Sequence, residues 1–219
     1  MTKLRLSYQT IEFGKTDIHL CTLRDKQEFY DPEQIAEKLG ISSSFWSLFG
    51  VVWPSSLVLA HFMNDFDTDS KRILEVGCGI GLSSLLLNKQ HADITATDYH
   101  PEVGAFLERN VLLNQDADIT FEQVDWAAKK DQLGLFDLII GSDLLYEDQH
   151  IELLAHFIEK HSKPSCEVII VDPKRGRKNK LSARMVEFGF TSSEQKPLKT
   201  DDYLDQEFKG HILTFKRSA

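Results

Sequence analysis

From Lys71 onward, short apolar runs alternate with segments of helical periodicity, and this alternation constrains the fold more than any other feature. The expected strands are 72–76, 94–98, 119–125, 136–143 and 166–172, and the expected helices are 81–90, 101–114, 150–161 and 181–190. Such alternation is typical of a mostly parallel sheet with helices on both faces. The last apolar run, 211–216, has no helix after it, so we expect it to pair with a segment just upstream.

The first 50 residues do not follow this alternation. Two alternating runs, 4–13 and 17–24, flank a Gly-Lys turn and predict a β-hairpin. Asp31 is placed to cap a short helix that Gly40 ends, and Pro54 is expected to begin the next helix. We therefore expect an N-terminal extension, residues 1–50, packed on one main domain, residues 51–219.

Composition limits the possible settings and partners. The chain has 219 residues, 42% of them hydrophobic, which suffices for one domain with a substantial core. The net charge of −9 makes nucleic acid an unlikely partner. No apolar run reaches about 18 residues, and the polar start lacks the apolar segment of a secretory signal. The three cysteines form neither a disulfide pattern nor a CxxC pair, and no metal site is expected. We expect a cytoplasmic protein without a membrane partner.

The segment 72–87, RILEVGCGIGLSSLLL, predicts a strand, a tight turn and a helix. Glu75 precedes three glycines at alternate positions, Gly77, Gly79 and Gly81. Glycine permits positive φ and lets backbone N–H groups approach a ligand at a helix N-terminus. The spacing is G-x-G-x-G, whereas dinucleotide-binding proteins carry G-x-G-x-x-G. A nucleotide-binding oxidoreductase is therefore a poor alternative.

Polar and aromatic side chains also follow the next two expected strands. Asp98 stands where a carboxylate can accept both hydroxyls of a ribose, although it could instead cap the helix that follows. Asp125 and Trp126 offer a carboxylate for an exocyclic amine and an indole for the face of a ring, although Trp126 could belong to the core. All three residues end strands, which is where ligands bind in open α/β sheets. Together they indicate a pocket for an adenosine without a pyrophosphate.

Four segments of this chain resemble a known family. They are VVWPSSLVLA, ILEVGCGIGLSS, the VDW of 124–126, and FDLIIGSDLLYEDQH. Over roughly residues 45–175 the chain resembles the seven-strand S-adenosylmethionine-dependent methyltransferases, and in particular the METTL-type branch of protein-lysine methyltransferases called family sixteen. The resemblance implies a Rossmann-like, doubly wound α/β fold with a mostly parallel seven-stranded sheet and an antiparallel last strand. It also implies S-adenosyl-L-methionine as cofactor and S-adenosyl-L-homocysteine as product.

The resemblance also implies which residues contact the cofactor. The nine candidates are Trp53, Glu75, Gly77, Gly79, Gly81, Asp98, Asp125, Trp126 and Ser142. Glu75 and the glycines would shape the methionine end, whose carboxylate suits backbone amides at a helix N-terminus. Ser142 would line the pocket beside the sulfonium. Trp53 would lie over the cofactor, and its alternative role is a hydrophobic anchor of the extension.

The acceptor side is expected at Ser142-Asp143-Leu144-Leu145-Tyr146, which resembles the acid-x-x-aromatic motif that the branch carries after its fourth strand. Methyl transfer needs proximity, alignment and an uncharged nucleophile. Asp143 could orient a lysine ammonium, and Tyr146 could add an aromatic face and a hydroxyl group. A carboxylate favours the charged ammonium, so proton loss to water is expected rather than to Asp143. An N-cap is the structural alternative for Asp143.

The expected function is transfer of a methyl group to a lysine of a protein substrate, by a chain for which a monomer is favoured. A small-molecule amine methyltransferase of the nicotinamide type and a non-catalytic S-adenosylmethionine-binding protein are the alternatives. The basic cluster, five cations between Lys174 and Lys180, is either a contact for an acidic substrate surface or a solvated loop. Asn110 and Asn114 share a helical face, and their role is open at this stage.

Overall fold

The computed structural model describes residues 4–25, 31, 33–43, 47–146 and 148–218. The strands are β1 (Leu6–Phe13), β2 (Thr16–Leu23), β3 (Arg72–Val76), β4 (Asp93–Asp98), β5 (Thr120–Gln123), β6 (Phe136–Ser142), β7 (Ser162–Asp172), β8 (Thr191–Gln195) and β9 (His211–Arg217). The α-helices are α1 (Ile35–Lys38), α2 (Pro54–Asn64), α3 (Leu82–Lys89), α4 (Val103–Asn114), α5 (Asp148–His161) and α6 (Lys178–Glu187). Two short 3-10 helices are η1 (Leu48–Gly50) and η2 (Thr200–Asp202).

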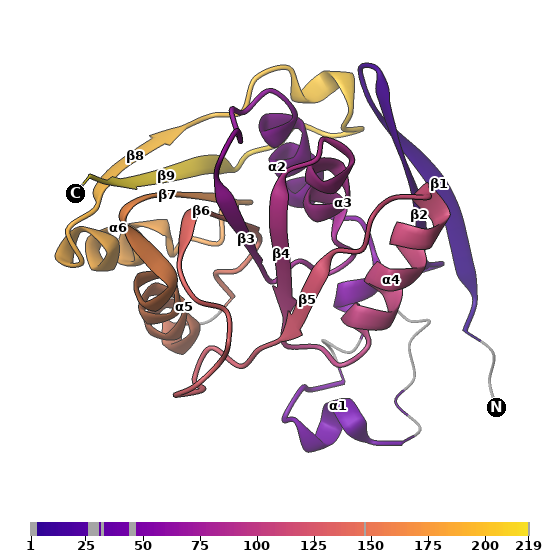
Figure 1. Ribbon diagram of the computed structural model, residues 1–219, viewed down its shortest axis with the longest axis horizontal. Helices are drawn as coiled ribbons and strands as arrows, with labels where there is room; N and C mark the ends of the chain where they lie inside the picture. The colour runs from indigo at the N-terminus through magenta and orange to yellow at the C-terminus, as the bar shows by residue number, and fades with distance from the viewer. Residues whose placement is uncertain (1–3, 26–30, 32, 44–46, 147, 219) are drawn as a thin grey trace.

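Seven strands form one sheet in the order β5-β4-β3-β6-β7-β9-β8 (Figure 1). The pairs from β5 to β7 are parallel, whereas β9 is antiparallel to both of its neighbours. This confirms the predicted α/β fold and the antiparallel last strand. The upstream partner expected for the last strand is β8. Its residues were not identified in the sequence, because TSSEQ has no apolar alternation and all five of its residues are exposed at the sheet edge.

The period-2 alternation of the strands divides the core into two layers. Even-numbered residues of β3 and β7, such as Leu74 and Val168, pack with α5 and α6. Odd-numbered residues, such as Ile73 and Ile169, pack with α2 on the other face. Successive strand side chains point to opposite faces, so both faces of this sheet are apolar and covered.

The hairpin β1–β2 forms a separate two-stranded sheet beside α4 (Figure 1). Two asparagines of α4 bind the backbone of β2. The Asn110 side chain accepts a hydrogen bond from the N–H of Cys21 at 2.7 Å and donates one to its carbonyl at 3.3 Å. Asn114 makes the same pair of bonds with His19, at 2.8 and 2.7 Å. The shared helical face noted in the sequence therefore anchors the predicted N-terminal extension to the main domain.

The short helix predicted after the hairpin is present as α1, but it begins at Ile35 with Gln34 at the N-cap position, three residues after the expected cap Asp31. The Asp31 carboxylate accepts hydrogen bonds from the backbone N–H groups of Ile35 and Glu37, both at 2.9 Å. The segment that follows α1 reaches the carboxyl edge of the main sheet, because the Tyr99 hydroxyl donates a hydrogen bond to the carbonyl of Leu39 at 2.5 Å. The N-terminal region thus contributes one wall of the space at that edge.

Candidate functional site

A cavity of about 590 Å³ lies at the carboxyl ends of the parallel strands. Its walls come from the turns after β3, β4, β5 and β6 and from the N-terminal segments 39–42 and 48–53. Pockets of this size at this edge of an open α/β sheet are typical sites for small ligands. The cavity gathers residues that are up to about a hundred positions apart in the sequence, including Gly77, Asp98, Trp126 and Tyr146.

The glycine loop after β3 forms the floor of the cavity. Gly77, Gly79 and Gly81 all have positive φ, between 53° and 74°. A Cβ on Gly77 would lie 2.5 Å from Cδ2 of Leu144, and one on Gly79 would lie 3.3 Å from the carbonyl oxygen of Phe49. Glycine is therefore required here both for its left-handed backbone and for the close approach of neighbouring residues.

Glu75 and Gly81 support the loop from behind and do not line the cavity. The buried Glu75 carboxylate accepts hydrogen bonds from the backbone N–H of Ser84, at 2.9 Å, and from the Ser84 hydroxyl. It thereby caps the first turn of α3. Burial raises the pKa of Glu75 to about 7, although the bonds from Ser84 oppose that shift. Glu75 can thus shape the site, as predicted, but it does so from behind the loop and does not reach a ligand in the cavity.

Asp98 joins two of the turns that surround the cavity. Its carboxylate accepts hydrogen bonds from the backbone N–H groups of Gly79 and His100, both at 2.9 Å. It therefore organises its own turn, which was the structural alternative, and it also holds the glycine loop. Burial raises the pKa of Asp98, against the opposing effect of these bonds. Each carboxylate oxygen has a second lone pair, so ribose hydroxyls can still donate to it.

The other predicted cofactor residues line the same cavity. Trp53, Asp125, Trp126 and Ser142 all contribute to its walls. The Trp53 indole N–H donates to the carbonyl of Leu48 at 2.9 Å, so this residue both anchors the N-terminal segment and faces the cavity. The exposed Asp125 carboxylate accepts a hydrogen bond from the backbone N–H of Ala127 at 2.8 Å. Trp126 is half-buried against the apolar core beside α5.

Sequence reasoning missed three aromatic or imidazole side chains of the wall. The ring of Phe49 stacks on that of His100 with centroids 4.1 Å apart, and Tyr99 lines the wall next to them. Tyr99 and His100 follow Asp98 directly, so the rule that ligands bind at the carboxyl ends of strands pointed to them as well. Phe49 lies in η1, and the sequence held no signal that this turn would reach the glycine loop.

Asp143 and Tyr146 form the part of the cavity that follows β6. Asp143 has φ 55°, a conformation that short polar residues tolerate, and its side chain is 6% exposed. Its two carboxylate oxygens accept hydrogen bonds from Nε and Nη2 of Arg175, at 2.7 and 2.9 Å. The same guanidinium lies over the Tyr146 ring, 4.6 Å from the ring centroid. Burial and the charge of Asp143 raise the pKa of Tyr146 to about 12.

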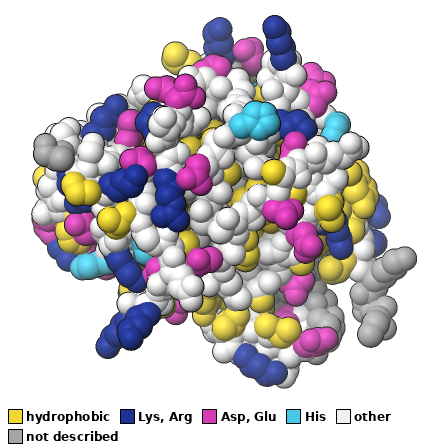
Figure 2. Space-filling view, viewed as in Figure 1, with side chains coloured by type: hydrophobic (Ala, Val, Ile, Leu, Met, Phe, Trp, Pro, Cys, Tyr) yellow, Lys and Arg dark blue, Asp and Glu magenta, His cyan; other side chains and the backbone are white. Residues whose placement is uncertain are grey.

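Three further cations of the basic cluster, 174–180, are paired within the chain. Arg177 and Lys180 pair with Asp148 at the start of α5, and Lys178 pairs with Glu194 of β8. Figure 2 shows this mixing, with basic and acidic side chains interleaved over the side that carries α5 and α6. Four of the five cations pair with acids of the chain, and much of the segment is exposed where it leads into α6. Contact of this cluster with an acidic substrate surface stays a prediction.

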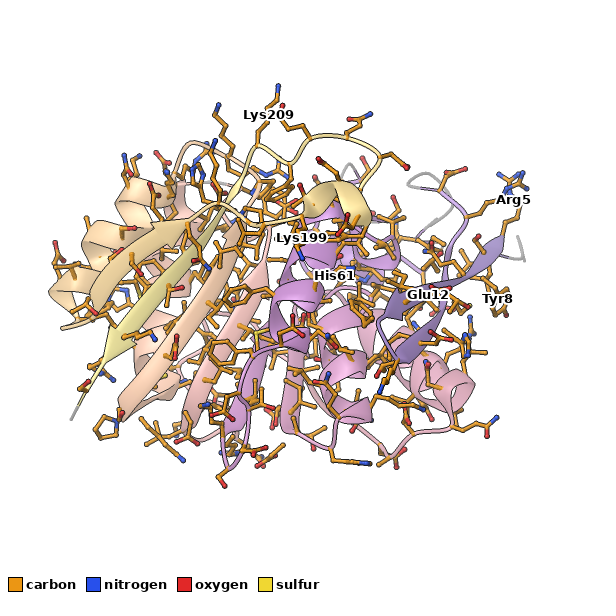
Figure 3. The ribbon with its side chains drawn as sticks, turned by 90° about the horizontal axis from the view of Figure 1, so that it is seen from above. Arg5, Tyr8, Glu12, His61, Lys199 and Lys209 are labelled. Atoms are coloured by element: carbon orange, nitrogen blue, oxygen red, sulfur yellow. The ribbon has the colours of Figure 1, made fainter. Side chains whose placement is uncertain are left out.

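A second cavity, of about 610 Å³, lies between the hairpin, α2 and η2. In Figure 3, His61 lies between the strand that carries Glu12 and the segment after Lys199. Its ring stacks on Tyr203 with centroids 3.8 Å apart. This cavity shares only Val51 with the first one and contains none of the predicted site residues.

Two features are absent from the part of the chain that the structure describes. No group of three or more histidine, cysteine, aspartate or glutamate side chains is arranged to hold a metal ion. No helix within the described ranges has the length and apolar character required to cross a membrane.

Comparison with known proteins adds the family. A family profile described as lysine methyltransferase matches residues 36–187, which include Trp53, the glycine loop, Asp143 and Arg175. The chain belongs to this family. The match covers more than half of the chain and contains the whole cavity edge from β3 to β7. The methyltransferase resemblance stated from the sequence is confirmed.

Individual relatives have names of the same class. Protein N-lysine methyltransferase METTL21A of Danio rerio is 30% identical over 138 residues, which are 58% of this chain and 63% of that protein. Calmodulin-lysine N-methyltransferase of Arabidopsis thaliana is 27% identical over 136 residues, 57% of this chain and 45% of that protein. The chain spans less than two thirds of the length of these curated relatives.

Solved structures share the fold. Magnesium protoporphyrin IX methyltransferase from Synechocystis PCC 6803, solved with bound S-adenosylmethionine, matches with a TM-score of 0.56 and 19% identity, over 75% of this chain and 78% of that one. That structure thus has the same fold and holds the cofactor that the sequence resemblance implies for this chain.

The residues of the cavity suit this cofactor. The glycine loop offers a floor without side chains, Asp98 offers a carboxylate for ribose, and Asp125 with Trp126 offers a carboxylate and an aromatic face for adenine. The acceptor groups Asp143 and Tyr146 lie in the same cavity. A bound cofactor and an acceptor nitrogen would therefore share one space.

Proposed function

We propose that the chain transfers a methyl group from S-adenosylmethionine to the side-chain nitrogen of a lysine in a protein. One observation carries the proposal: Asp143 and Tyr146, which both line the cavity, already bind a cation together, the Arg175 guanidinium. A carboxylate beside an aromatic ring is a combination that binds organic cations. The names of the two relatives, both lysine methyltransferases, support the same acceptor.

The bound cofactor supplies a methyl carbon attached to a positively charged sulfur, which a nitrogen lone pair can displace. The chain has to align the acceptor nitrogen and receive it without its extra proton. Asp143 orients the amine, and Tyr146 supplies a ring face and a hydroxyl group that stays protonated at neutral pH. The N–C bond forms while the S–C bond breaks, its electrons remain on sulfur, and the proton has left the nitrogen for water beforehand.

We further propose that the protein acts in the cytoplasm, as a monomer, on a protein and not on a nucleic acid. The net charge of −9 supports a basic or neutral partner over a polyanion. Cys21, Cys78 and Cys166 are all free and buried, which agrees with a reducing compartment.

The test uses methyl-tritiated S-adenosylmethionine and a lysate of the source organism from which the gene has been deleted. Purified wild-type protein is added to one sample and the Asp143→Ala variant to another, and both are separated on a gel. A discrete labelled protein band that the variant fails to produce supports the proposal. Label confined to the small-molecule fraction would indicate an amine metabolite instead, and the absence of label from both fractions would indicate a cofactor-binding protein without catalysis.

A further inference from the structure

Arg175 is held in place by the loop that follows β7. The buried Asp172 carboxylate accepts hydrogen bonds from the backbone N–H groups of Lys174, at 3.1 Å, and Arg175, at 3.3 Å. Lys174 has φ 81°, a left-handed conformation that is uncommon for a residue with a long side chain. Gly210 packs closely beneath, since a Cβ there would lie 2.2 Å from the carbonyl oxygen of Asp172. The loop backbone is therefore fixed, and it holds the guanidinium against Asp143 and Tyr146, which line the cavity.

The contact between Arg175 and Asp143 uses both carboxylate oxygens. Arginine matches a carboxylate through two parallel hydrogen bonds, and such charge-assisted bonds are among the stronger ones in proteins. The Asp143 side chain is 6% exposed, whereas that of Arg175 is 36% exposed. The negative charge of Asp143, which lines the cavity, is thus neutralised by a partly exposed side chain that does not line it.

This pairing bears on a chemical difficulty of the proposed function. An unpaired carboxylate beside a lysine ammonium stabilises the charged form and opposes the loss of its proton. A carboxylate that is already paired with a guanidinium still has lone pairs that can orient the amine. It attracts a positive charge less strongly than an unpaired carboxylate does. The net charge of the Asp143–Arg175 pair is zero, so an amine that enters the cavity meets a polar group and not a net anion.

We propose that Arg175 is a positioning residue that neutralises Asp143 and fixes its carboxylate, so that a bound lysine loses its proton near neutral pH. This inference rests on the proposed function, because it concerns the same acceptor. It gives Arg175 a role distinct from those of Arg177, Lys178 and Lys180, which pair with residues of α5 and β8.

Other titratable groups interact with this pair or line the same cavity. Tyr146 on the same loop and Asp172 at the end of β7 interact with the pair. The groups that line the cavity are Cys78 after β3, Asp98 at the end of β4, Tyr99 and His100 after it, Asp125 after β5, and His150 on α5. The described residues of the N-terminal wall, 39–42 and 48–53 among those lining the cavity, carry no ionisable side chain. A pH effect of these other groups would appear in every variant, so only a shift specific to Arg175 bears on the proposal.

The first experiment measures kcat and KM between pH 6 and pH 10 with methyl-tritiated S-adenosylmethionine and total protein of the deletion strain as acceptor. The variants are Arg175→Ala and Arg175→Lys, and the matched control is Arg177→Ala, which removes a neighbouring ion pair with Asp148 outside the cavity. We expect Arg175→Ala to move the midpoint of the kcat profile upward by about one pH unit or more. At pH 7 its kcat should fall about tenfold and recover toward the wild-type value at pH 10, while KM falls. Arg175→Lys should recover part of the shift, and the control should keep the wild-type midpoint.

A second experiment needs no protein substrate. Calorimetry measures the binding of n-butylammonium, a mimic of the lysine side chain, to protein loaded with S-adenosylhomocysteine at pH 7. We expect Arg175→Ala to bind this cation about tenfold more tightly than the wild type or Arg177→Ala, because Asp143 has lost its neutralising partner.

The outcomes separate this inference from the proposed function. A wild-type protein that labels no protein contradicts the proposed function, whereas the n-butylammonium result still tests the pairing. A wild-type protein that labels a lysine, together with an Arg175→Ala variant whose midpoint is unchanged, overturns the role of Arg175. If Arg175→Ala lowers KM and leaves kcat unchanged at every pH, Arg175 only competes with the acceptor. If Arg175→Ala raises KM at every pH, its role is merely structural. Either result overturns the inference.

Discussion

The carboxylate of Asp98 accepts a hydrogen bond from the backbone N–H of Gly79 at 2.9 Å. This bond connects the two parts of the cofactor site that the sequence separates by nineteen positions, the glycine loop after β3 and the acid at the end of β4. The residue expected to hold the ribose therefore also holds the loop expected to hold the methionine end. Loss of this side chain should disturb both ends of the cofactor.

Asp98→Ala is expected to weaken S-adenosylmethionine binding by about 10- to 100-fold, the loss of one or two hydrogen bonds to a charged group. Asp143→Ala is expected to leave the dissociation constant within about threefold while it removes methyl transfer, because Asp143 serves the acceptor. Calorimetry on both variants measures the dissociation constants. An equal loss of cofactor binding in the two variants would contradict this division of roles.

Tyr146→Phe is expected to lower kcat by about tenfold through loss of the hydroxyl group, with no change in the pH dependence of kcat between pH 7 and pH 10. Burial and Asp143 raise the pKa of Tyr146 to about 12, so the phenol stays protonated throughout this range and does not act as the base. The measurement is the pH profile of initial rates for both proteins. If the initial rate of the wild type changes with pH below pH 10 and that of Tyr146→Phe does not, the phenol ionises during turnover, which would contradict this prediction.

Glu75→Gln is expected to change the pH dependence of stability. Burial raises the pKa of Glu75 in the folded state to about 7, above its ordinary value of 4.5 in the unfolded chain. The protonated side chain therefore favours folding at low pH, and this contribution is lost as pH rises toward and through 7. Relative to the wild type, the variant should gain about 2 kcal/mol in free energy of unfolding between pH 5.5 and pH 8. Urea denaturation of the cofactor-free proteins at several pH values tests this, and a difference independent of pH would contradict it.

Asn110→Ala is expected to lower the free energy of unfolding by about 2 to 4 kcal/mol, because the N–H and carbonyl of Cys21 lose their side-chain partner in a buried position. The matched control is Glu108→Ala, an exposed position of the same helix, for which a change within about 0.5 kcal/mol is expected. Urea denaturation at one pH compares the three proteins. Equal stability of Asn110→Ala and the control would show that the hairpin is not anchored by this side chain.

The fold followed closely from the sequence because its strands are apolar on both faces and its helices carry clear periodicity. Both the first and the last residue of strand β3, Arg72–Val76, were predicted correctly, and β9 lies where the apolar run 211–216 predicted a strand. An upstream partner for β9 was expected, but the position of this edge strand, β8, was not identified, since its exposed polar residues leave no hydrophobic pattern to detect. Hydrophobic patterns in a sequence indicate which side chains are buried, so they do not identify an element whose side chains are all exposed.

The site was predicted in part. The sequence did not reveal which side chains from neighbouring strands contact one another. Asp98, Asp125 and Asp143 could be placed on one edge because each ends a strand, and all three line the cavity. The pairing of Asp143 with Arg175 depends on which strands are neighbours, and the sequence alone does not fix the order of β6 and β7. The same is true of Phe49, which reaches the glycine loop only through the fold of the N-terminal segment.

The central claim is that the acceptor is a lysine nitrogen, and amino-acid analysis of the labelled protein tests it most directly. The band labelled by the wild-type protein from methyl-tritiated S-adenosylmethionine is excised, hydrolysed in acid and separated against methylated amino-acid standards. The account predicts that tritium elutes with ε-N-methylated lysine and that Asp143→Ala yields none. Tritium that elutes with methylated histidine or arginine, or at a position other than methylated lysine, would contradict it.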